Sequence, residues 1–274
     1  MYNIIMTTYI VFDLDETIGY FTQFGIIWES IEYLFEDKLS QHYFNCVLDL
    51  YPNFLRPNIL TIFRYLKLKK QHNNNLKILI YTNNQGPKSW CNFIAGYIEY
   101  KLKYKLFDQI IYAFKVNGRH IEFKRTTHNK TYMDFKRCVG CNNNDKICFI
   151  DDQFHPSMKH KNIYYINIKP YYNDYDTDIL VNKFINSNCY ELLCKDYHYE
   201  KNKIKDSNKI NNFIKSYNYV KTNKLPEEEK LDNKLSKHLL FHIQKFLKLH
   251  LKKSKKTRKR QKNKHNKSKK NNNK

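Results

Sequence analysis

Five short apolar segments rich in β-branched and aromatic residues recur along this chain, and stretches with helical spacing separate them. Nearly continuous hydrophobic runs of this length are typical of strands that are buried on both faces of a sheet. Strands that alternate with helices favour βαβ units and therefore a parallel sheet with helices on its faces. We predict an α/β, doubly wound parallel sheet whose strands cover residues 8–14, 77–82, 108–114, 146–152 and 163–169.

The positive charge of the chain is unevenly placed. The 274 residues carry a formal charge of +23, yet residues 252–274 alone contain thirteen Lys or Arg and no acidic residue. Blocks of like charge repel themselves and are typical of disordered tails. Such blocks are also found in nuclear localisation signals and in segments that bind nucleic acid through its phosphates.

The amino-acid composition changes after Cys194, and we predict four regions along the chain. Residues 1–195 hold the predicted sheet, and the polar stretch 196–225 is expected to be a linker. Residues 226–251 are predicted to be an amphipathic helix, because Pro226 and three Glu precede a stripe of Leu, Ile and Phe. A disordered basic tail, 252–274, is expected to follow.

The cysteines and the apolar runs favour an intracellular protein, with the basic tail compatible with the nucleus. No run approaches the ~20 apolar residues of a membrane span, and no secretory signal is evident at the start. The seven Cys are an odd set, which indicates reduced thiols. Cys138 and Cys141 form a lone C-x-x-C, which we interpret as small buried hydrophobes rather than a zinc or redox site.

Two of the predicted strands end in paired acids. Asp13 and Asp15 lie at the end of the first, and Asp151 and Asp152 lie at the end of the fourth. In an open α/β sheet, ligands bind outside the carboxyl ends of the strands, so these acids converge if the two strands are neighbours. Clustered carboxylates require a cation to stay ionised together, and hard oxygen ligands favour Mg²⁺.

Other polar residues at this edge extend the set of reactive groups. Thr82 and Asn83 follow the second strand, and a lysine lies between the third and fourth. A carboxylate nucleophile, a hydroxyl, a lysine and metal-binding acids are the components of phosphoryl transfer. The order of these elements along the chain also differs from that of bacterial receiver domains, which carry the acid pair on the first strand.

The motif from Val11 to Thr17, V-F-D-L-D-E-T, resembles the haloacid dehalogenase superfamily of phosphohydrolases. Its D-L-D-E-T form is similar to the branch that holds the RNA polymerase II C-terminal-domain phosphatases and the NLI-interacting-factor-like proteins. Leu55–Ile59, L-R-P-N-I, is similar to the R-P-G segment of that branch. The resemblance spans about residues 8–170 and implies a haloacid-dehalogenase-like fold with strand order 3-2-1-4-5 and a small cap or none.

The resemblance also implies site roles. Asp13 would be the nucleophile that forms an aspartyl-phosphate, and Asp15 the general acid and base. Thr82 would hydrogen-bond the phosphoryl group and Lys130 would offset its charge, with Lys124 as a rival lysine because the K-D-L element of the branch is absent. Beside Thr82, Asn83 is expected either to donate to the phosphate or to hold the turn. Mg²⁺ would be held by Asp13, by the main-chain carbonyl of Asp15, and by Asp151 or Asp152, which stand where the branch has D-N.

These implications predict a Mg²⁺-dependent phosphatase, with phosphoprotein Ser/Thr as the expected substrate. A nucleic-acid end phosphatase, which would suit residues 252–274, and a non-catalytic binding protein of the same fold are the alternatives. Phe21, Phe24 and Trp28 follow the first motif and are expected in the core more than in a substrate pocket. His155 is expected to be a loop residue rather than a ligand.

Overall fold

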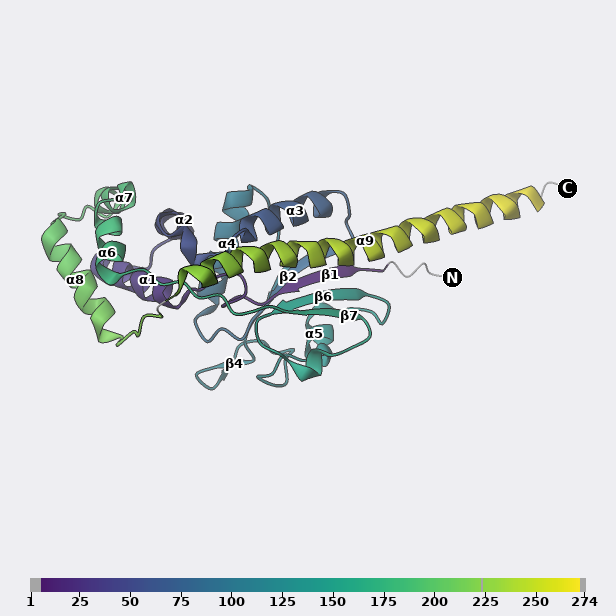
Figure 1. Ribbon diagram of the computed structural model, residues 1–274, viewed down its shortest axis with the longest axis horizontal. Helices are drawn as coiled ribbons and strands as arrows, with labels where there is room; N and C mark the ends of the chain where they lie inside the picture. Colours follow the sequence, from purple (N-terminus) through teal and green to yellow (C-terminus); the bar gives the residue numbers. More distant parts are fainter. Residues whose placement is uncertain (1–5, 223, 272–274) are drawn as a thin grey trace.

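Five parallel strands form the central sheet of this protein (Figure 1). The computed structural model describes residues 6–222 and 224–271, with side chains described as far as His250. The strand order is β3-β2-β1-β6-β7, which confirms the order predicted for the five segments. A separate two-stranded hairpin, β4 and β5, lies between β3 and β6 in the chain. The strands are β1 (Thr8–Phe12), β2 (Leu76–Tyr81), β3 (Gln109–Ile111), β4 (Lys115–Val116), β5 (Arg119–His120), β6 (Lys146–Asp151) and β7 (Ile163–Asn167).

The register of the three central strands aligns their carboxyl ends. Phe12 of β1 lies opposite Ile80 of β2 on one side and opposite Ile150 of β6 on the other. The residues that directly follow these positions therefore lie at one edge of the sheet. This edge receives the side chains that follow β1, β2 and β6.

Alternate residues of the strands face two different layers of helix. Ile10 and Phe12 belong to a core shared with α3, α4 and α9. Tyr9 and Val11 face the opposite way, into a smaller core with α5. The helices concerned are α3 (Ile59–Gln71), α4 (Lys88–Leu102), α5 (Tyr132–Val139) and α9 (Pro226–Asn271). The predicted α/β architecture with helices on both faces is confirmed.

A lobe of helices extends from the carboxyl edge of the sheet (Figure 1). It combines α1 and α2, which precede β2 in the chain, with α6, α7 and α8, which follow β7. The prediction of a small cap or none missed this lobe, because half of it comes from residues beyond the stretch that carries the resemblance. The lobe helices are α1 (Thr22–Phe35), α2 (Gln41–Leu50), α6 (Thr177–Ile185), α7 (Asn188–Asp196) and α8 (Lys203–Ser216).

The prediction of a polar linker over 196–225 is wrong, because α8 occupies its centre. Asp206 is fully buried and accepts hydrogen bonds from the hydroxyls of Tyr190 and Tyr199, at 2.6 and 2.7 Å. Ile210 and Ile214 bury the apolar side of the helix. The polar composition concealed these two residues, whose spacing of four is that of one helix face.

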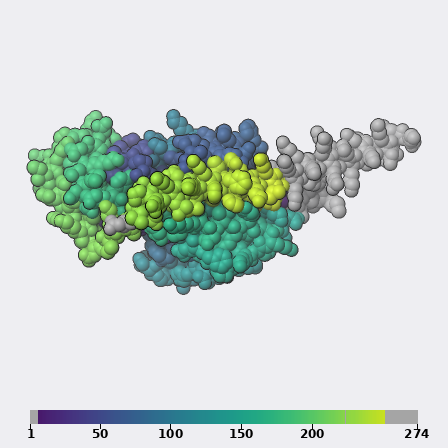
Figure 2. Space-filling model, viewed as in Figure 1, coloured from purple at the N-terminus to yellow at the C-terminus, as the bar shows by residue number. Residues whose placement is uncertain are grey.

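Helix α9 lies across one face of the molecule (Figure 2). It packs on β6 and β7 and runs opposite to β7, since Glu228 contacts Lys169 and His242 contacts Tyr164. The predicted start at Pro226 and the apolar stripe are confirmed, since Leu239, Ile243, Phe246 and Leu247 are buried. Residues 252–274 were expected to be disordered, but the helix continues to Asn271; 272–274 lie outside the described residues. Lys and Arg are good helix formers, and no Gly or Pro interrupts the stretch. No helix in the described ranges combines the length and the apolar character needed to cross a bilayer.

Cys138, in α5, and Cys141, just after it, are buried in the core, as expected for small hydrophobes. Burial raises the pKa of Cys138 to about 12 and that of Cys141 to about 11, so both thiols stay protonated. All seven cysteines are free thiols.

Candidate active site

Three carboxylates meet at the carboxyl edge of the sheet. Asp13 follows β1, while Asp151 and Asp152 come from the end of the neighbouring strand β6. One oxygen from each of the three lies within 4.8 Å of the others. Asp13 and Asp151 are buried, and Asp152 is half-buried. The predicted convergence of these acids is therefore present in the structure.

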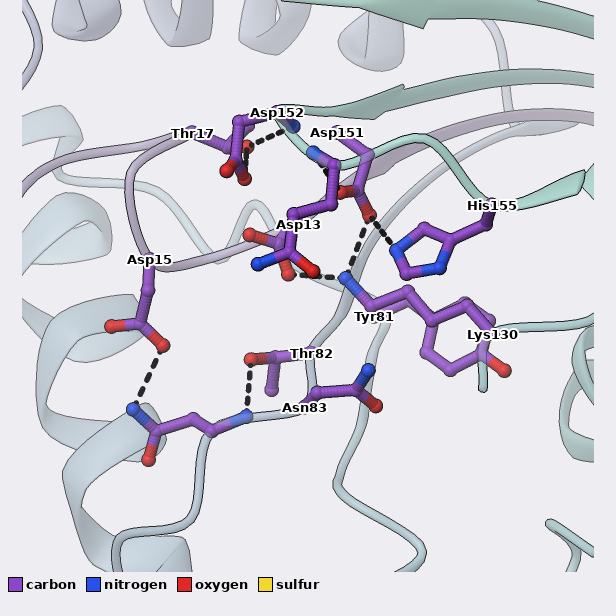
Figure 3. A network of polar contacts seen from close by, with 12 residues as sticks. Asp13, Asp15, Thr17, Tyr81, Thr82, Asn83, Lys130, Asp151, Asp152 and His155 are labelled. Carbon is purple, nitrogen blue, oxygen red and sulfur yellow. Dashed lines mark hydrogen bonds and ion pairs between the residues drawn. The ribbon is translucent and has the colours of Figure 1, made fainter. Parts of the chain in front are cut away.

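Lys130 places its ammonium between two of these carboxylates (Figure 3). It donates to Asp13 Oδ1 and, at 2.7 Å, to Asp151 Oδ2, and only 2 % of its side chain is exposed. Its position is fixed by the start of α5, where the Thr131 hydroxyl caps the helix by accepting from the Asp134 amide. Lys124, the rival lysine, is exposed. We call Asp13, Lys130, Asp151 and Asp152 the carboxylate–lysine cluster.

Burial and neighbouring charge act against each other in this cluster. Burial raises the pKa of Asp13 well above its usual range; Lys130 opposes the rise and Asp151 adds to it. The pKa of Lys130 is raised, because Asp13 and Asp151 together outweigh the effect of burial. Asp151 keeps a lowered pKa despite its burial, because His155 and Lys130 donate to it. Burial and the adjacent Asp151 raise the pKa of Asp152. The cluster holds more negative charge than its one lysine balances.

Asp15 lies on the other side of Asp13 and has different surroundings. Its Oδ2 accepts from the side-chain amide of Asn84 at 2.8 Å. Burial raises the pKa of Asp15, while the Asn84 hydrogen bond and Lys130 lower it. A raised pKa suits a carboxyl group that must first give up a proton and then take one back.

Thr82 and Asn83 both follow β2, but their side chains face different partners. Thr82 is buried, and its Oγ1 accepts a hydrogen bond from the main-chain N–H of Asn84 at 3.0 Å. The hydroxyl hydrogen of Thr82 is left to donate elsewhere. Asn83 was expected either to donate to the phosphate or to hold the turn; its amide oxygen accepts from Arg125 at 2.8 Å, which agrees with the second role. The buried Arg125 also donates to the main-chain oxygen of Thr82, so Asn83 stabilises the loop.

The loop after β1 is held in place by Thr17 and Arg56. The Thr17 hydroxyl donates to Asp152 Oδ1 and accepts from the Asp152 amide, both at 3.1 Å. Arg56, 1 % exposed, donates to the carbonyls of Thr17, Glu16 and Lys169 at 2.6–2.8 Å. Glu16 has a φ of 59°, a left-handed conformation that a non-glycine residue adopts only when neighbours enforce it. The L-R-P-N-I segment thus supports the loop that carries Asp13 and Asp15.

Three residues in contact with the site were not predicted from sequence as parts of it. His155 Nε2 lies 3.3 Å from Asp151 Oδ2, although a loop role was expected. Asn84 and Arg125 organise the loop after β2. For Asn84 a signal existed, since it directly follows the two residues that were singled out. For Arg125 none did, because its contacts to the loop after β2, at Thr82 and Asn83, join residues 43 and 42 positions apart.

A cavity of about 840 Å³ adjoins Asp15 and Asn84, and we call it the α1–α4 cavity. Phe21, Phe24 and Trp28 are all buried in the core, as expected, and Phe21 and Trp28 also line the cavity. The walls come from α1, from the loop after β2, from α4 and from the end of α8.

No family model, no curated protein and no solved structure matches this chain.

Proposed function

We propose that this protein is a Mg²⁺-dependent phosphomonoesterase of the haloacid dehalogenase type, working through an aspartyl-phosphate. The observation that carries the proposal is the ion pair between Asp13 and the buried Lys130. A second acid, Asp15, whose pKa is raised, lies two residues after Asp13 in the chain. The confirmed strand order and the carboxyl-edge position of these groups support the resemblance of the V-F-D-L-D-E-T motif.

In the first step, a carboxylate oxygen of Asp13 forms a bond to phosphorus as the bond from phosphorus to the alcohol oxygen breaks. Asp15 gives its proton to the departing alkoxide. In the second step, Asp15 takes a proton from water, whose oxygen attacks phosphorus. Phosphate leaves and the Asp13 carboxylate is restored. Thr82 donates to a phosphoryl oxygen, and Lys130 balances the charge of the phosphoryl group.

The donor set fits a hard divalent cation. Asp13, Asp151 and Asp152 offer oxygens within 4.8 Å of one another, and a single ammonium leaves negative charge uncompensated. Mg²⁺ prefers carboxylate oxygens and retains open positions for a phosphate. These three carboxylates, with the Asp15 main-chain carbonyl, would hold the ion. When bound, it would neutralise charge on the phosphoryl oxygens.

Phosphoprotein Ser/Thr is the substrate class that the resemblance suggests. The thirteen Lys and Arg of residues 252–274 favour a second candidate, the phosphorylated end of a nucleic acid, because such a segment attracts phosphates. A non-catalytic role is disfavoured, since the acids, the lysine and the hydroxyl are all present together. The nuclear address suggested by the same basic residues belongs to this proposal.

The test is a phosphatase assay on the full chain with Mg²⁺, using an aryl phosphate, phosphopeptides, phosphosugars and 3′- or 5′-phosphorylated oligonucleotides. We expect hydrolysis that EDTA abolishes and that Asp13→Asn removes. Trapping the aspartyl-phosphate with ³²P-labelled substrate, followed by acid precipitation, would identify Asp13 as the acceptor. An unlabelled protein with full turnover would contradict the covalent route.

A further inference from the structure

We propose that the α1–α4 cavity binds an organic cation carried by the substrate, so that the alcohol released by the enzyme bears an apolar group with a positive charge. The inference rests on the proposed phosphatase function and names the substrate class for that site. Three features of the cavity support it: its position beside Asp15, its aromatic walls, and its unbalanced negative charge.

The position of the cavity assigns it to the leaving group. Asp15 and Asn84 line it, while Asp13, Lys130 and Asp151, although described, are not among its lining residues. The acid that protonates the departing oxygen must lie on the leaving-group side of phosphorus. The remainder of the alcohol, which is attached to that oxygen, then extends into the cavity.

Five aromatic side chains contribute to the walls of the cavity. Phe21, directly before α1, and Trp28, in its middle, are almost fully buried, whereas Trp90 and Phe93, from the first turns of α4, are half-buried. Tyr217, just after α8, also lines the cavity. Aromatic faces attract alkylammonium and guanidinium groups, and Trp is the most effective of them. These walls therefore suit an apolar cation as well as a neutral ring, and charge decides between the two.

The charge of the lining favours the cation. Glu29, exposed on α1, accepts from the Tyr217 hydroxyl and forms no ion pair with any described residue. Glu32 is balanced by Lys38, whose Nζ lies 2.6 Å from its Oε2. Of the three acids of the lining, Asp15 enters the first step protonated and Glu32 is paired with Lys38, so Glu29 carries the unbalanced negative charge, in a chain whose formal charge is +23. A leaving group with a second phosphate would meet Glu29 unfavourably.

The test compares substrates of the same shape that differ only in charge. Phosphocholine and 3,3-dimethylbutyl phosphate release a cationic and a neutral alcohol of nearly equal size. We expect kcat/KM to favour phosphocholine by about tenfold, the scale of a desolvated cation–π contact. A second pair, a phosphoserine peptide with a neighbouring Arg and the same peptide with citrulline, shows whether the cation comes from a peptide instead. Preference for the charged member of either pair supports the proposal, and preference in neither overturns it.

Variants of the lining give the charge effect a direction. Glu29→Gln should bring the cationic-to-neutral ratio toward one, and Lys38→Met should increase it because Glu32 is left unbalanced. Glu36→Gln removes the same charge from the end of α1, outside the lining, and serves as the matched control. An unchanged ratio in Glu29→Gln would overturn the assignment, as would a preference for nucleoside monophosphates over phosphocholine.

A binding measurement separates this inference from the proposed function. Trp28 and Trp90 are the two tryptophans of the chain, and both line the cavity, so intrinsic fluorescence reports on it directly. Choline should change the emission of the full chain at lower concentration than 3,3-dimethylbutan-1-ol does. Choline binding without hydrolysis of any phosphoester would refute the phosphatase and keep the cation site. Hydrolysis of phosphoesters with no charge preference and no choline binding would refute the cation site and keep the phosphatase.

Discussion

The two ends of the site are built by different means, although Asp13 and Asp15 are two residues apart. In the carboxylate–lysine cluster, partners are shared: Lys130 contacts two carboxylates, and Asp151 also contacts His155. On the Asp15 side the contacts are single, with one hydrogen bond from Asn84 and an aromatic cavity beyond it. The comparison teaches that a change in the cluster affects every member, whereas a change near Asp15 alters one property at a time.

Asp13→Asn should have the largest effect, because it removes the attacking oxygen while keeping the shape of the side chain. Turnover of an aryl phosphate should fall by at least about a thousandfold. Near-ultraviolet circular dichroism should stay unchanged, which excludes misfolding. Retention of more than about a tenth of the wild-type rate would exclude Asp13 as the nucleophile.

Lys130→Met tests the shared partners of the cluster. It leaves Asp13 and Asp151 facing each other without their buried counter-charge, so the free energy of unfolding in urea should fall by about 3–5 kcal/mol. Turnover should be lost as well. Lys124→Met is the matched control, because Lys124 is exposed, and its effect should stay within about 0.5 kcal/mol. Equal damage in the two variants would break the comparison.

The metal ligands should respond unequally. EDTA should abolish turnover and Mg²⁺ should restore it, while Ca²⁺ should not, because its coordination is larger and looser. Asp151→Asn should raise the Mg²⁺ concentration for half-maximal activity more than Asp152→Asn does, because Asp151 also contacts Lys130 and His155 through its carboxylate. Full activity in chelator would remove the metal from the proposal.

Asn84→Ala sharpens the comparison on the Asp15 side through pH. Burial already raises the pKa of Asp15, and the hydrogen bond from Asn84 lowers it. Without that bond the pKa of Asp15 rises further, so Asp15 stays protonated to higher pH. The alkaline limb of the kcat/KM profile therefore shifts to higher pH. Asn83→Ala, which loses only the contact to Arg125, should leave the limb in place. A downward movement in Asn84→Ala would contradict the role of Asp15.

Deleting residues 252–274 should have the smallest effect on chemistry. Helix α9 runs opposite to β7, from Lys169 at the carboxyl edge toward Tyr164, so its basic end points away from the site. Turnover of an aryl phosphate should be unchanged. Any nucleic-acid binding should be lost, after showing in the full chain a log–log salt slope of roughly −0.9 per phosphate contacted. Equal binding by the shortened chain would exclude these residues as the contact.

The sheet and the acids were predictable from sequence because their signals are local. Buried strands are continuous apolar runs, and Asp13 and Asp151 directly follow or end such runs. Helix α8 of the lobe was not predictable, because its polar composition hides Asp206 and Ile210, which are buried by packing against other parts of the lobe. Thr82 and Asn83 were singled out and Asn84, which contacts Asp15, was not, since adjacent residues in a loop point in different directions and sequence does not say which.

The lobe has a consequence for how the molecule opens. Helix α8 packs on both α1 and α6, and the Tyr217 hydroxyl after it contacts Glu29 of α1. Helix α1, from the first part of the chain, and α8, from the last third, are therefore packed together at the edge of the site. Neither helix can unfold locally without exposing the other. Native-state hydrogen exchange should show the amides of α1 and α8 opening as one cooperative unit, with the emission of Trp28 changing in step.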